Sequence, residues 1–80
     1  MQLDSETRSD LLETIKAAAA SLTDLDTALH SMDLVNLQGK VAALMASEIV
    51  LLRQIAARFY GVELPDDPVR ISEEIGNIPA

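Results

Sequence analysis

The stretch VAALMASEIVLLRQIAARFY, residues 41–60, carries fifteen apolar side chains in twenty positions. Its charged residues are Glu48, Arg53 and Arg58, and its longest uncharged run is seven residues. A helix that spans a bilayer needs about 20 consecutive, predominantly apolar residues. The pattern therefore predicts a helix that is buried against other protein and does not span a membrane.

The apolar residues of this helix lie on two faces. The first face extends to the preceding residues and is interrupted by Glu48; it comprises Leu34, Leu37, Val41, Leu44, Leu51 and Ile55. The second face is roughly 100° away, one residue further round the helix, and comprises Met45, Ile49, Leu52, Ala56 and Phe59. One neighbouring helix covers one such face, so the helix needs more than one partner.

The segment before it, from Asp4 to His30, has a single apolar stripe. Its members alternate in steps of four and three residues, which is typical of a helix packed along its length on another helix: Leu11, Ile15, Ala18, Leu22, Leu25, Leu29 and Met32. Asp4 and Ser5 are candidate N-caps. The segment predicts a helix over about residues 5–30.

A change of register separates the two helices. The first stripe would continue onto Asn36, Gly39 and Ala43, which are polar or small. Together with the candidate N-caps Ser31 and Asp33, this predicts a turn within residues 30–33 and a second helix over about residues 34–60. No Gly or Pro marks the turn, so a turn at residues 38–39 and one long kinked helix remain alternatives.

The C-terminal part predicts a short third helix. Glycine is favoured directly after the C-terminal end of a helix, so Gly61 predicts the end of the second helix. Pro65 prevents that helix from continuing further. Asp67 then serves as an N-cap and Pro68 as the first residue of a helix over about residues 68–75. The fold class is all-α, with residues 1–80 forming a single helical domain made of an antiparallel hairpin and a short C-terminal helix.

Length and composition favour a homodimer. The chain has 80 residues and no cysteine, and domains this small commonly gain stability by oligomerisation. Two hairpins would form a four-helix bundle with the 34–60 helix inside. The predicted dimer or partner interface comprises Leu44, Met45, Ile49, Leu51, Leu52, Ile55 and Phe59.

The charge distribution disfavours direct nucleic-acid binding. The formal net charge is -7, with seven acids and two bases in residues 1–33 against one acid and three bases in residues 34–60. Glu48, Arg53 and Arg58 either form buried pairs that set the register of a dimer or contact a partner, or line the one exposed strip of the second helix with the arginine stems over apolar neighbours. In both cases we expect salt bridges to the acids of the first helix. The acidic N-terminus MQLDSETRSD has no features of a targeting signal, so we expect a cytoplasmic protein.

Candidate catalytic and metal-binding residues are sparse. His30 is the only histidine, and the acidic pairs at 24/26, 66/67 and 73/74 are one or two residues apart, so they do not face each other on a helix. We expect no enzyme activity, no metal, no cofactor, no membrane partner and no small-molecule substrate. The expected function is protein–protein interaction, as in an adaptor, chaperone, antitoxin or phage-encoded inhibitor, with a protein partner that the sequence does not identify.

The stretch IAARFYGVELPDDPVRI, residues 55–71, resembles the end of the second helix and the following loop of acyl carrier proteins. The resemblance covers about a fifth of the chain and implies a phosphopantetheine attached to a serine. The candidate serines are Ser47, which lies between Ala46 and Glu48 where the family has an Asp-Ser-Leu motif, and Ser31, which lies 34 residues before Pro65. A carrier module modified on Ser47 or Ser31 is the alternative function.

Overall fold

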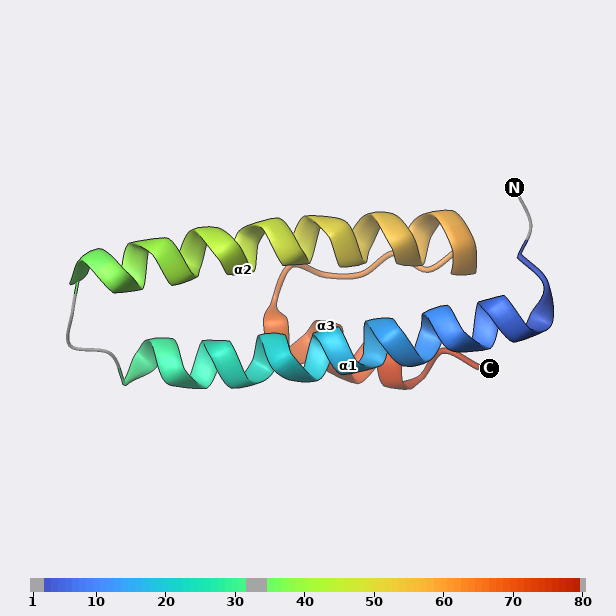
Figure 1. Ribbon diagram of the computed structural model, residues 1–80, viewed down its shortest axis with the longest axis horizontal. Helices are drawn as coiled ribbons and strands as arrows, with labels where there is room; N and C mark the ends of the chain where they lie inside the picture. The colour runs from blue at the N-terminus through green and yellow to red at the C-terminus, as the bar shows by residue number, and fades with distance from the viewer. Residues whose placement is uncertain (1–2, 32–34, 80) are drawn as a thin grey trace.

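The computed structural model describes residues 3–31 and 35–79, which are helical with connecting segments and contain no strand. Helix α1 spans Ser5–His30, α2 spans Val35–Ile55, and α3 spans Pro68–Gly76 (Figure 1). A π-helical turn, η1, continues α2 over Ala56–Tyr60. The predicted all-α class is confirmed.

Helices α1 and α2 form an antiparallel hairpin and lie side by side over most of their length (Figure 1). Gln38 and Gly39 lie inside α2, so the chain does not turn there. The antiparallel arrangement of α1 and α2 excludes one long kinked helix (Figure 1). The predicted stripe and cap positions Met32, Asp33 and Leu34 lie outside the described residues.

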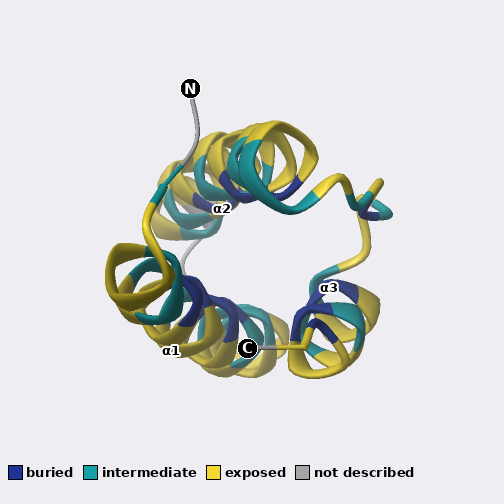
Figure 2. Ribbon diagram, turned by 90° about the vertical axis from the view of Figure 1, so that its right-hand side faces the viewer, coloured by how far each residue is buried: buried dark blue, intermediate teal, exposed yellow. Residues whose placement is uncertain are grey.

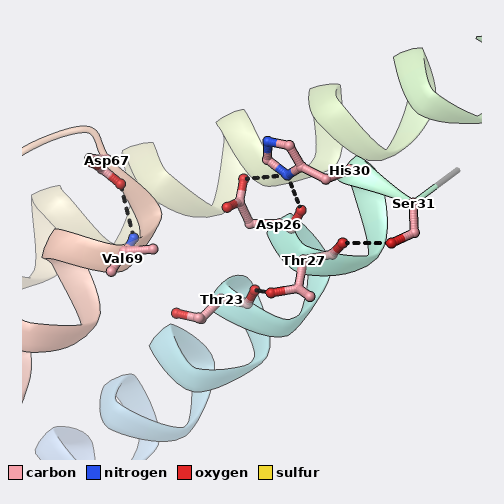
Figure 3. A network of polar contacts seen from close by, with 7 residues as sticks. All are labelled: Thr23, Asp26, Thr27, His30, Ser31, Asp67 and Val69. Carbon is pink, nitrogen blue, oxygen red and sulfur yellow. Dashed lines mark hydrogen bonds and ion pairs between the residues drawn. The ribbon is translucent and has the colours of Figure 1, made fainter.

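Short carboxylate side chains cap the first turns of α1 and α3. The backbone N–H of Thr7 donates to Asp4 Oδ1 at 2.7 Å. The N–H of Val69 donates to Asp67 Oδ1 at 3.0 Å, and Pro68 occupies the first turn, where its missing N–H has no cost (Figure 3). These local contacts explain why both helices begin where they do.

The π-helical turn ends at Gly61, which has a left-handed backbone with φ 65°. Glycine adopts this conformation without steric penalty, and the N–H groups of Gly61 and Val62 both donate to the carbonyl of Ala56. The chain then returns in extended form beneath α2 (Figure 1). The Nε of Arg53 holds it there by donating to the carbonyl of the buried Leu64 at 3.0 Å.

Helix α3 packs along α1, so that the three helices surround one core (Figure 2). The molecule is elongated, with extents of 45 × 19 × 18 Å. The buried apolar residues are Leu12, Ile15, Ala19 and Leu22 from α1, Met45 and Leu52 from α2, Ala56 from η1, Ile71 and Ile75 from α3, and Leu64 and Ile78 from the flanking segments. Helix α1 thus packs against both α2 and α3.

The half of the hairpin next to its turn is thinly packed. Within the described part of the chain, no buried core residue follows Leu22 on α1 or precedes Met45 on α2. Leu25, Leu29 and Val41 are partly buried there. The core is therefore concentrated at the end of the molecule where α3 lies.

Candidate interaction surface

Helix α2 exposes a line of leucines beside the face that it turns to the core. Leu37, Leu44 and Leu51 are 45 %, 54 % and 57 % exposed. Val50 is 51 % exposed and lies about 100° further round the helix. The three leucines are named here the outer face of α2, and together with Val50 they make up all but one of the large exposed apolar side chains among the described residues. Leucines spaced by seven residues follow one line along a helix, which is the pattern of a helix–helix contact.

A shallow groove between α1 and α2 adjoins this face. Its volume is about 230 Å³, and its lining is mostly apolar: Leu11, Thr14, Ile15, Ala18, Glu48, Leu51, Leu52 and Ile55. Leu51 belongs to both the groove and the outer face. The two features therefore form one continuous apolar surface across the hairpin.

Glu48 is the charged residue of the groove. Its Oε2 atom is shielded from solvent and has no hydrogen-bond partner among the described residues. A buried polar atom without a partner costs about 1–3 kcal/mol, and more when the group is charged. A molecule that fills the groove and carries a hydrogen-bond donor would remove that cost.

The structure divides the predicted interface residues between this surface and the core. Leu44 and Leu51 are exposed, while Ile49 and Ile55 are partly buried against the core. Phe59 is half-buried at the end of η1. Leu44 and Leu51 are thus the members of the predicted set that are most open to a partner.

Met45 and Leu52, by contrast, lie inside the protomer, at 5 % and 4 % exposure. They belong to the second apolar face of α2, which packs with the buried side chains of α1, of α3 and of the return segment 61–67. The chain's own C-terminal part therefore covers much of the second face, and Leu37, Leu44 and Leu51 of the first face are left exposed.

The predicted salt bridges between α2 and the acids of α1 do not form among the described residues. Their ion pairs, His30 with Asp26 and Arg70 with Glu74, lie within single helices. Arg53 instead donates to a backbone carbonyl, and the guanidinium of Arg58 lies 5.8 Å from the Phe59 ring centroid. Carbonyl and ring contacts replace the expected ion pairs, so this prediction was wrong.

A contact that the sequence analysis missed joins α1 to η1. The guanidinium of Arg8 donates to the carbonyl of Phe59 at 2.6 Å and lies 4.3 Å from the centroid of the Tyr60 ring. The hydroxyl of Tyr60 in turn donates to the carbonyl of Arg8. These residues are more than 50 positions apart, and no local pattern links them.

The other candidate residues occupy ordinary helical positions. The hydroxyl of Ser47, in the middle of α2, donates to the carbonyl of Ala43 at 3.2 Å. Ser31 donates to the carbonyl of Thr27 at the end of α1, and His30 Nδ1 lies 2.7 Å from the carbonyl of Asp26 (Figure 3). Each of these side chains is exposed and contacts its own helix.

Comparison with models of protein families, with curated proteins and with solved structures finds no match to this chain. Within residues 3–31 and 35–79, no group of three or more His, Cys, Asp or Glu side chains could hold a metal ion. None of the helices in that part is both long and apolar enough to cross a bilayer. The apolar surface of α1 and α2 is therefore the feature of the described residues that bears on function.

Proposed function

We propose that the protein is a non-enzymatic, all-helical interaction module that works as a homodimer, in which two hairpins meet through the outer face of α2 and form a four-helix bundle. The observation that carries this proposal is the line of exposed leucines beside an open apolar groove. Burying a leucine that was exposed to water contributes about 1.5–3 kcal/mol. In a symmetric dimer every such residue contributes twice.

The packing of the single chain supports the same proposal. The half of the hairpin next to the turn has no fully buried side chain among its described residues, although it carries Leu25, Leu29, Leu37, Val41 and Leu44. A second hairpin on the outer face would complete the core of that half. Association would thereby stabilise the part of the fold that α3 does not reach.

The surface that the dimer would leave free is acidic. Glu6, Asp10, Glu13 and Asp24 are exposed along α1, and the whole chain has a net charge of -7. Such a surface attracts proteins with a basic face and speeds their encounter. We propose that the dimer presents it to another protein, as an adaptor, chaperone, antitoxin or inhibitor would.

Sedimentation equilibrium of the wild-type protein and of the Leu44→Asp variant tests the dimer. We expect a dimer for the wild type and a monomer for Leu44→Asp, because the change places a carboxylate in the centre of the contact. Val69→Asp is the matched control, since Val69 is also apolar and is 45 % exposed but lies on α3. A wild-type protein that stays monomeric at high concentration and unfolds cooperatively would refute the proposal.

A further inference from the structure

We infer that the two α2 helices of the dimer run antiparallel with the two-fold axis beside Leu44, and that Lys40 of each copy pairs with the partner's Glu48. This inference rests on the proposed homodimer and specifies its register. It is drawn from the symmetry of the outer face and from the unpaired carboxylate in the groove.

The sequence of the outer face is symmetric about Leu44. Leu37 and Leu51 lie seven residues to either side of it. An antiparallel neighbour centred on Leu44 therefore places Leu37 opposite the partner's Leu51, and the two Leu44 side chains beside each other. Each exposed leucine of one copy then meets a leucine of the other.

The two charges nearest the centre follow the same symmetry. Lys40 and Glu48 lie four residues to either side of Leu44, which is about 6 Å along the helix axis at 1.5 Å per residue. The antiparallel register thus brings Lys40 level with the partner's Glu48, and it does so twice in a two-fold dimer. The flexible four-carbon stem of lysine allows its ammonium group to reach across the contact.

Other registers do not satisfy both features. A parallel pair would place Glu48 beside the partner's Glu48, so that two like charges would share an apolar seam. An antiparallel pair shifted by one heptad, with Leu44 opposite the partner's Leu51, would place Leu37 opposite the partner's Arg58. The register centred on Leu44 matches all three leucines and also pairs the carboxylate.

The state of Glu48 in the protomer gives the ion pair its physical reason. Its Oε2 atom is shielded from solvent without a donor, whereas Lys40 is exposed. The lysine ammonium supplies the missing donor, and its stem covers the neighbouring apolar surface. A polar pair inside an otherwise apolar helix contact selects one register over others that bury similar area.

Charge reversal tests the pairing. We expect Lys40→Glu and Glu48→Lys each to weaken the homodimer by about tenfold or more, because each places like charges together in the contact. The double variant should recover the wild-type affinity, and an equimolar mixture of the two single variants should form heterodimers. Lys16→Glu and Glu13→Lys are matched controls on exposed positions of α1 and should leave affinity unchanged.

Cysteine cross-linking tests the direction of the helices, because the chain has no cysteine of its own. Leu44→Cys should form an interchain disulfide by itself under mild oxidation. Leu37→Cys and Leu51→Cys should each fail to do so alone and should cross-link efficiently when mixed. Efficient self-linking of Leu37→Cys would show a parallel contact and overturn the inference.

The homodimer and its helix register can be refuted separately. A wild-type chain that sediments as a monomer overturns the homodimer, and the register with it. A wild-type dimer in which the double charge reversal does not recover affinity, or in which Leu37→Cys links to itself, overturns the register alone. Circular dichroism of each variant shows whether a loss of affinity reflects the contact or a loss of helix.

Discussion

At the scale of single residues, Asp4 shows how one carboxylate determines where a helix begins. Its side chain accepts a hydrogen bond from the backbone N–H of Thr7, in the first turn of α1. Hydrogen bonds from the Thr7 backbone and then from its side chain hold the pKa of Asp4 below its ordinary value of 3.8. The ionised form is therefore favoured by folding.

This linkage predicts a pH dependence. Because the pKa is lower in the folded chain than in the unfolded chain, the contribution of Asp4 is complete above its ordinary value and is lost as pH falls through the folded-state pKa. Asp4→Asn keeps a capping oxygen but removes the charge, so its melting temperature should fall less than that of the wild type between about pH 5 and about pH 2. Parallel thermal melts measure this, and identical slopes would contradict it.

At the scale of the element, α2 has apolar residues on two faces, and some of them are buried in the core while others are exposed. Leu51 and Leu52 are neighbours in sequence and roughly 100° apart around the helix. Leu52 is buried among the core residues, whereas Leu51 borders the groove and is exposed. The same residue type thus serves the core at one position and the surface at the next.

Substituting the two leucines separates these roles. Leu52→Ala removes a buried side chain and should lower the free energy of unfolding by about 2–5 kcal/mol. Leu51→Ala should leave the helical content of the protomer unchanged and weaken association instead. Urea denaturation and sedimentation of both variants provide the comparison, and equal loss of stability from the two changes would contradict the placement of α2.

At the scale of the whole molecule, the two ends of the hairpin are held together differently. The end near the chain termini is tied by Arg8 to the carbonyl of Phe59 and to the ring of Tyr60, and by the hydroxyl of Tyr60 to the carbonyl of Arg8. The end near the turn lacks a buried core among its described residues. We therefore expect the contacts of Arg8 with Phe59 and Tyr60 to stabilise one end of the hairpin. We expect a partner chain to stabilise the other end.

Substitutions of Arg8 and Tyr60 should change the stability of the protomer more than they change its dimerisation. Tyr60→Phe retains the ring beneath Arg8 but loses one hydrogen bond, so it should reduce the free energy of unfolding by about 0.5–1.5 kcal/mol. Arg8→Ala loses the hydrogen bond to Phe59 and the ring contact as well, and should be more destabilising. Tyr60 is about 24 Å from Leu44 along the helix. Both variants should therefore change the affinity of the dimer little. A large shift of either variant towards monomer in sedimentation would contradict this expectation.

The sequence by itself identified the segments that form helices, because helix formation depends on local signals. Asp4 marks the start of α1, Asp67 and Pro68 mark the start of α3, and Gly61 marks the end of η1. The period of the apolar residues shows which segments are amphipathic. The sequence also showed that α2 has more apolar surface than one helix can cover, since that follows from its composition and periodicity.

Only the tertiary structure decided which face of α2 is inside. The second face packs with α1, with α3 and with the return segment at Leu64, and this choice depends on contacts between residues far apart in the chain. The tie between Arg8 and Tyr60 has the same origin, because the two residues are 52 positions apart in the chain. The period of the apolar residues identifies both faces of a helix but does not show which of them is buried. That depends on which face the distant segments of the chain pack against.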